Sequence, residues 1–141
     1  MREVASKMAT RKIFISFEYG DVNYKNMLIA WSKNPDFADF YINDQSVTEP
    51  VDSDRAAPIK RVISMRIAES TGLLCIVGKN TAGSGWVKWE INKAIEFRKH
   101  LIAVKLAKDY STPSPLFNAG ASWALSFTFP SIRDAIDEAY A

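Results

Sequence analysis

The segment "GLLCIVG" at residues 72–78 constrains the fold more than any other part of the chain. Its residues are apolar at nearly every position, whereas a strand with one wet face would alternate apolar and polar side chains. Such a run is typical of a central strand in a parallel sheet that is covered on both faces. Cys75 lies inside the run, so we interpret it as a small buried hydrophobe and not as a nucleophile.

Short β-branched or aromatic runs alternate with stretches of helical period on both sides of this segment. We expect strands at 12–17, 39–44, 72–78, 100–106 and 123–129, with helices at about 24–31, 59–67, 86–99 and 130–141 between or after them. Pro130 marks the start of the last helix. The pattern predicts an α/β protein, a flavodoxin-like doubly wound parallel sheet in strict strand and helix alternation, whose ligands bind beyond the carboxyl ends of the strands.

Length and charge limit the classes of function. A chain of 141 residues, 48% of them hydrophobic, can bury one real core, so we expect a single domain over 11–141 after a flexible arm at 1–10. The net charge of +2, spread along the chain, argues against nucleic acid as a partner. No apolar run approaches the length of a membrane span, and the first residues lack a signal-peptide core. One cysteine and one histidine, His100 at a helix-to-strand junction, cannot assemble a structural zinc site. We therefore expect a cytoplasmic protein without a bound metal.

The glycine-rich run "GKNTAGSG" at 78–85 follows a strand and precedes a helix, as a phosphate-binding loop does. After G-x-x-x-x-G that motif requires Lys and then Ser or Thr, but Ser84 and Gly85 follow Gly83 here. A plain turn, with Ser84 or Gly85 capping the next helix, is the better interpretation.

The helix after this turn carries the most informative acid of the chain. At 100° per residue Val87, Ile91, Ala94 and Ile95 share one side, and Glu90 lies on the margin of that apolar stripe. A carboxylate at that margin would be partly desolvated, which suits a functional acid. The alternative is an ordinary acid near a helix N-terminus, paired with Lys93 one turn on.

Trp89 projects toward the polar side of the same helix. It packs under the N-terminal arm or marks a self-association surface, and the sequence favours neither.

Four segments together resemble a known family: "RKIFISF", "SVTEP", "LLCIVGKNT" and "WVKWEINKAIEFRKHLIAV". They are similar to the TIR-like domains of bacteria and archaea, a group that includes the TIR component of the Thoeris antiphage system. The resemblance covers roughly residues 11–106, and its most specific part is the W-V-x-x-E-I segment. It implies a five-stranded parallel sheet in the order 2-1-3-4-5.

The resemblance also implies NAD chemistry, with NAD as substrate and no separate cofactor. Glu90 matches the acid that catalytic TIR domains need to break the bond between nicotinamide and ribose. A fixed carboxylate there can stabilise the oxocarbenium-like ribose, and nicotinamide is already a cationic leaving group that needs no second acid. The other residues that the resemblance places around the substrate are Ser16, Phe17 and Tyr19 after the first strand, Asp44 and Ser46 after the second, and Trp86 beside Glu90.

By the same resemblance the protein would be an NAD nucleosidase, ADP-ribosyl cyclase or transferase that makes an ADP-ribose-derived signalling nucleotide. It would respond to a phage-derived trigger, self-associate on activation and reach a separate effector through its diffusible product. The competing hypothesis is a non-catalytic TIR-like protein-interaction module. A receiver-like phosphorylation domain is disfavoured, because the third strand ends in "IVGKN" without a phosphoacceptor Asp.

Overall fold

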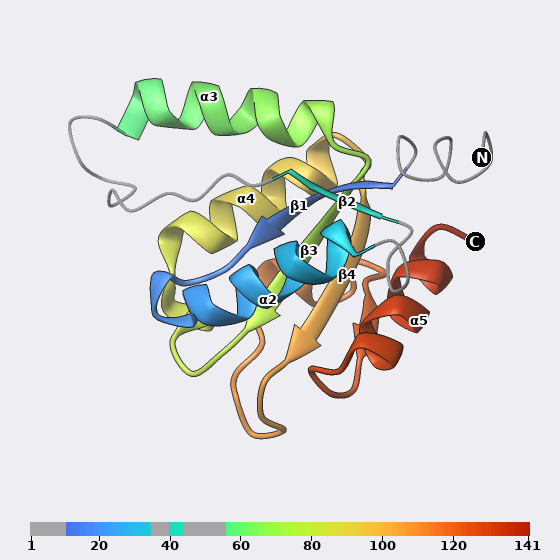
Figure 1. Ribbon diagram of the computed structural model, residues 1–141. Helices are drawn as coiled ribbons and strands as arrows, with labels where there is room; N and C mark the ends of the chain where they lie inside the picture. Colours follow the sequence, from blue (N-terminus) through green and yellow to red (C-terminus); the bar gives the residue numbers. More distant parts are fainter. Residues whose placement is uncertain (1–10, 35–39, 44–55) are drawn as a thin grey trace, which may run out of the picture.

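The computed structural model describes residues 11–34, 40–43 and 56–141, and within them strands and helices alternate around one parallel sheet (Figure 1). The strands are β1 (Lys12–Ser16), β2 (Tyr41–Asn43), β3 (Gly72–Val77), β4 (His100–Lys105) and β5 (Ser122–Ala124). All four strand pairs are parallel, and the order across the sheet is β2-β1-β3-β4-β5. The α/β arrangement that the sequence predicts is therefore confirmed, and β3 is the central strand.

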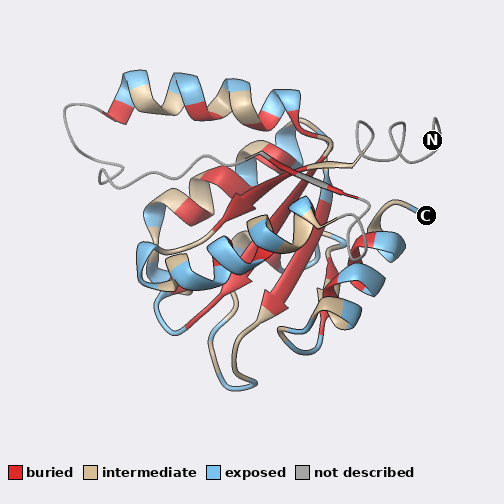
Figure 2. Ribbon diagram, in the orientation of Figure 1, coloured by how far each residue is buried: buried red, intermediate tan, exposed pale blue. Residues whose placement is uncertain are grey.

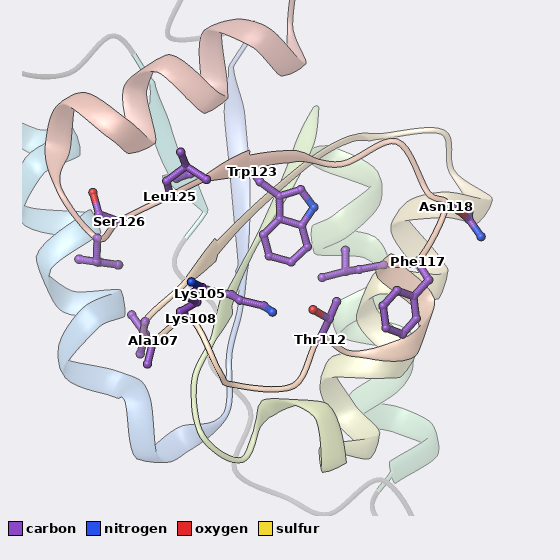
Figure 3. A pocket seen from close by; sticks show the side chains of 13 residues that line it. Lys105, Ala107, Lys108, Thr112, Phe117, Asn118, Trp123, Leu125 and Ser126 are labelled. Atoms are coloured by element: carbon purple, nitrogen blue, oxygen red, sulfur yellow. The ribbon is translucent and has the colours of Figure 1, made fainter.

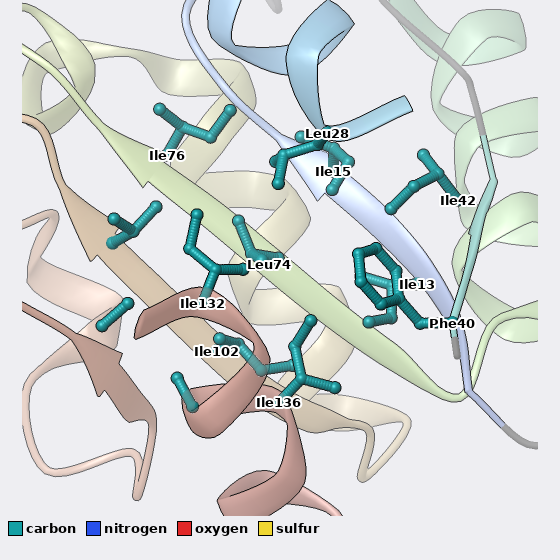
Figure 4. Packing of buried hydrophobic residues seen from close by; sticks show 13 residues of the cluster. Ile13, Ile15, Leu28, Phe40, Ile42, Leu74, Ile76, Ile102, Ile132 and Ile136 are labelled. Atoms are coloured by element: carbon teal, nitrogen blue, oxygen red, sulfur yellow. The ribbon is translucent and has the colours of Figure 1, made fainter. Parts of the chain in front are cut away.

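The four described α-helices cover the two faces of the sheet in pairs. They are α2 (Val22–Lys33), α3 (Ala56–Glu69), α4 (Gly85–Glu96) and α5 (Phe129–Ala139). Leu28 of α2 and Ile132 and Ile136 of α5 pack against Ile13, Ile15 and other side chains of one face (Figure 4). Ile63 and Ile67 of α3 and Val87, Ile91 and Ala94 of α4 pack against the other face.

Burial follows the two-sided cover of the sheet (Figure 2). Every residue of β3 is buried, as the uninterrupted apolar run predicts. Cys75 is fully buried among the side chains of the α3 and α4 face, which confirms its interpretation as a core residue.

The expected strict alternation fails between β4 and β5. That connection contains only the short 3-10 helix η3 (Ser114–Leu116), which follows the segment "DYSTP". Pro113 and Pro115 each lack a backbone N–H and so disfavour an α-helix there, and Asn118 adopts a left-handed conformation with φ 59°. The fifth strand is also shorter than expected, since it ends at Ala124, and the apolar-looking residues after it form the turn into α5.

The start of α5 matches a local sequence signal. Thr128 caps α5, with Pro130 in its first turn as predicted.

None of the described helices is long and apolar enough to cross a membrane.

Candidate functional site

Helix α4 begins at the carboxyl end of β3, where a short 3-10 helix, η2 (Thr81–Gly83), turns the chain. Ser84 caps α4 by accepting a hydrogen bond from the backbone N–H of Val87 at 3.2 Å. The Thr81 hydroxyl accepts from the backbone N–H of Gly78 at 2.7 Å, so this N–H is used inside the turn. The interpretation of the glycine-rich run as a capped turn is confirmed.

Glu90 lies in the second turn of α4 and points into the protein. It is only 5% exposed, on the same side of the helix as Val87, Ile91 and Ala94. The residue spacing along the helix predicted a position for Glu90 on the margin of the apolar stripe. The side chain is more buried than that, because the sheet and the neighbouring helices also cover it. Ile95, by contrast, is 40% exposed, so its expected place on the buried side is wrong.

The partner of Glu90 is the last residue of β1. The Ser16 hydroxyl is fully buried and donates a hydrogen bond of 2.7 Å to Oε1 of Glu90. Ser16 shares the α3 and α4 face of the sheet with Phe14, two residues before it, and β1 lies next to β3. This topology brings the serine beneath α4. Two of the residues expected at the site are therefore in direct contact.

The ionisation of Glu90 reflects its enclosure. Burial raises the pKa of its carboxyl from 4.5 to about 8, although the hydrogen bond from Ser16 favours the ionised form and lowers the pKa. The pairing with Lys93 that would make Glu90 an ordinary helix acid is absent, because the Lys93 amino group lies 3.1 Å from Glu96. At neutral pH, Glu90 is thus a largely protonated acid with a hydroxyl partner and no cation beside it among the described residues.

The two tryptophans of α4 lie together on its flank. The rings of Trp86 and Trp89 meet edge to face with their centroids 6.0 Å apart. Nε1 of Trp86 is buried without a hydrogen-bond partner among the described residues. Trp89 is half-buried at the core of the α3 and α4 face, with the amino groups of Lys60 and Lys93 each 5.7 Å from its ring centroid. Part of its surface is therefore covered by lysines from α3 and α4.

The remaining expected residues lie further from Glu90 or outside the described residues. Phe17 packs against the core of the α2 and α5 face, below the Lys25 amino group, and so on the other side of the sheet. Tyr19 is 58% exposed in the 3-10 helix η1 (Tyr19–Asp21). Asp44 and Ser46 fall in the stretch 44–55, which the structure does not describe.

A shallow hollow of about 540 Å³ lies at the sheet edge formed by the carboxyl ends of β1 and β3. Its lining comes from the segments after β1 and β3 and from the start of α4: Glu18, Lys79, Asn80, Gly83 and Ser84. In the sequence, Lys79 and Asn80 belong to the glycine-rich turn "GKNTAGSG", and nothing local indicates that they share a hollow with Glu18.

Asp21 borders this edge. Its Oδ2 atom is buried without a hydrogen-bond partner among the described residues and lies against Gly78, where a Cβ atom would collide with it. Burial and, second, the nearby charge of Glu18 raise the pKa of the Asp21 carboxyl. Together Glu90 and Asp21 place two acids with raised pKa values near the carboxyl ends of β1 and β3.

Comparison with known families adds one match. The sequence model of the TIR-like domain of the Thoeris protein ThsB matches residues 14–111, which is more than half of the chain. The matched region includes both Ser16 and Glu90. A comparison with curated proteins finds no match for the chain.

Proposed function

Because the chain belongs to the family of Thoeris ThsB TIR-like domains, which implies a role in antiphage defence, we propose that it is an enzyme that consumes NAD. It breaks the bond between nicotinamide and ribose and passes the ADP-ribose part to an acceptor, forming a cyclic or conjugated signalling nucleotide. The observation that carries the proposal is the buried Glu90 carboxyl, held by Ser16 at the ligand-binding edge of the sheet.

The main requirement of the reaction is that the protein stabilise positive charge on the ribose. As the C1′–N bond breaks, its electron pair leaves with the nicotinamide nitrogen, and positive charge develops on the ribose ring. A carboxylate fixed beside the ribose stabilises this charge and hydrogen-bonds the ribose hydroxyls. The Ser16 hydroxyl supports this role, because its hydrogen bond fixes Oε1 and leaves Oε2 for the substrate.

Ionisation of Glu90 follows from the substrate itself. A carboxyl with a pKa of about 8 is mostly neutral at pH 7, but the pyridinium ring of NAD carries a positive charge. A cation within a few ångströms favours the ionised form and lowers the pKa. Binding of NAD would therefore generate the carboxylate that the transition state needs.

Access to Glu90 is narrow. At 5% exposure its side chain offers little surface to a ribose, so we infer that the site opens before NAD binds. Such burial fits an enzyme that stays inactive until a phage-derived trigger or self-association opens the site. We place Trp86, the neighbour of the site on α4, at the wall of the opened pocket, with Tyr19, Asp44 and Ser46 as further contributors. Phe17 packs on the other face of the sheet and is not among them. The diffusible product would then act on a separate effector.

The test measures nicotinamide release by mass spectrometry, with the purified protein at high concentration and in extracts of phage-infected cells that produce it. Glu90→Gln keeps the shape and a hydrogen-bonding partner for Ser16 but cannot become a carboxylate. The matched control is Glu96→Gln on the same helix, because that side chain is exposed and pairs only with Lys93. We expect Glu90→Gln to lose at least about a hundredfold in rate, and Glu96→Gln to keep the wild-type rate.

Two results would contradict the proposal: equal nicotinamide release by wild type and Glu90→Gln, or no loss of NAD in infected cells that contain the wild-type protein. The mass of the second product identifies the acceptor, since free ADP-ribose, a cyclic isomer and a conjugate differ in mass or retention.

One observation favours the second candidate, a non-catalytic interaction module. Glu90 is closed off and neutral at pH 7 in the described structure, as a structural hydrogen-bonding residue would be. In that case antiphage protection would survive Glu90→Gln, whereas the enzymatic function predicts its loss.

A further inference from the structure

A second hollow, larger than the one beside Glu18 and Lys79, lies at the other half of the sheet edge, away from Glu90. It measures about 770 Å³, a size typical of small-molecule sites, and surrounds the carboxyl ends of β4 and β5. Its lining residues come from the end of β4, the long connection, β5 and the turn after it, namely Lys105–Lys108, Thr112, Leu116–Asn118 and Trp123–Phe127. Neither Ser16 nor Glu90 is among them.

The charged side chains that line this hollow are all positive. Lys105 and Lys108 line it, and none of its lining residues is acidic. Neither lysine forms an ion pair with another described residue. Two cations without an acidic partner among the described residues, at the edge where open α/β sheets bind ligands, attract an anion.

An aromatic surface lies beside these cations. Figure 3 shows the indole of Trp123, from the middle of β5, with the side chains of Lys105 and Thr112 close to it. The Lys105 amino group is 6.0 Å from the centroid of the indole, and Phe117, 62% exposed, stands at the rim. Asn118 and Gly120 are both left-handed, with φ 59° and 75°, and they shape the turn that holds Phe117 there. A half-buried indole with an ammonium group beside it is a stacking surface for the flat ring of a ligand that also bears an anionic group.

We propose that this hollow is a second ligand site, which binds a flat aromatic ring joined to a phosphate, a molecule of the size of a nucleoside monophosphate. The ring stacks on Trp123, the phosphate contacts Lys105 and Lys108, and the Thr112 hydroxyl supplies a hydrogen bond. The proposal depends only on these lining residues and is independent of the activity proposed for Glu90.

Three probes separate the parts of the ligand: AMP, which has ring and phosphate, adenosine, which lacks the phosphate, and ribose 5-phosphate, which lacks the ring. Binding is measured on the full chain by calorimetry and by the indole N–H signals of its four tryptophans. The signal that Trp123→Phe removes identifies Trp123. Glu90→Gln is measured in parallel, so that binding at the Glu90 site is distinguished from binding at this one.

We expect AMP to bind about tenfold more tightly than either fragment, to move the Trp123 signal, and to bind Glu90→Gln as it binds the wild type. Trp123→Ala and Lys105→Ala should each weaken AMP binding about tenfold. Lys105→Gln, which keeps the stem of the side chain, provides the test if Trp123→Ala does not fold.

The proposal is overturned if AMP shows no saturable binding at millimolar concentration, or if it moves the Trp86 and Trp89 signals and leaves that of Trp123 in place. Unchanged affinity in the Lys105 variants, or equal affinity for adenosine and AMP, also overturns it. If the hollow were instead covered by a second copy of the chain, AMP would show no saturable binding. The sedimentation coefficient would then rise with protein concentration.

Discussion

The hydroxyl of Ser16 donates a hydrogen bond of 2.7 Å to Oε1 of Glu90 across 74 residues of sequence, and both side chains are buried. This contact joins the end of β1 to the second turn of α4. It connects the stability of the fold to the ionisation of the one acid that the proposed chemistry requires.

Ser16→Ala should destabilise the protein by about 1–2 kcal/mol, because it leaves a buried carboxyl oxygen without its donor. Urea unfolding at pH 7 measures the loss. In a double-mutant cycle, Ser16→Ala and Glu90→Leu, which cannot accept the hydrogen bond, should be non-additive. Ser122→Ala, at a buried serine of β5, is the control and should add independently to Glu90→Leu. Additivity in both cycles would show that the Ser16 contact contributes nothing.

The free energy of unfolding should depend on pH through Glu90. Its folded pKa of about 8 lies above the ordinary 4.5, so the folded state holds the proton more tightly than the unfolded state. The stabilisation is complete below pH 4.5 and is lost as the pH rises through 8. Glu90→Gln does not titrate, so it should match the wild type near pH 5 and exceed it at pH 9, by on the order of 4 kcal/mol.

Denaturant titrations of both proteins from pH 5 to pH 9 test this difference. Glu96→Gln, at an exposed acid of the same helix, should show no such divergence. A gap between Glu90→Gln and wild type that stays constant with pH would mean that Glu90 is already ionised in the folded state.

The rate of NAD cleavage should rise with pH if the proposed function is right. The value of kcat/KM reports ionisation of the free enzyme, so it should increase about tenfold per pH unit below a pKa of about 8 and then level off. Ser16→Ala should move the midpoint to higher pH, since it removes the hydrogen bond that lowers the pKa of Glu90. Initial rates of nicotinamide release across pH 6 to 9 decide the matter, and a flat profile would exclude ionisation of Glu90 as a requirement.

Cys75 should react with thiol reagents only when the protein opens. Burial and, second, the charge of Glu90 raise the pKa of its thiol, and its side chain is fully enclosed. Labelling by a chromogenic disulfide should therefore follow the free energy of unfolding, and accelerate as urea is added. Labelling of the native protein at the rate of a free thiol would indicate that β3 is accessible.

Arg98→Gly should stabilise the protein by about 0.5–1 kcal/mol. Arg98 follows the C-cap residue of α4, Phe97, and has φ 57°, a left-handed conformation that glycine adopts without strain. Its N–H donates to the Ile95 carbonyl at 3.0 Å. Thermal unfolding measures the gain. Arg98→Ala is the control, because it removes the charge but keeps the Cβ atom, and an equal gain in both variants would assign the effect to charge.

The local signals of the sequence predicted much of the architecture. The uninterrupted apolar run marked β3 as the central strand, since only a strand covered on both faces tolerates it. Ser84 and Pro130 marked the starts of α4 and α5, because caps and first-turn prolines act within a few residues of chain. The end of β5 was less predictable, because the apolar residues after Ala124 favoured a longer strand, whereas they form the turn into α5.

Local sequence also predicted some features of the candidate site, while tertiary packing decided the others. The W-V-x-x-E-I segment singled out Glu90 by its resemblance and by its place on the helix, both of which are local properties. Its hydrogen bond to Ser16 joins residues 74 positions apart in the sequence. Its burial, which raises its pKa, comes from the sheet and the helices that enclose it. The hollow around Trp123 likewise depends on the register of β4 with β5 and on the turn at Asn118 and Gly120. Local sequence thus determined which residues could act, and only tertiary packing decided their contacts and charge, because desolvation depends on every element that surrounds a group.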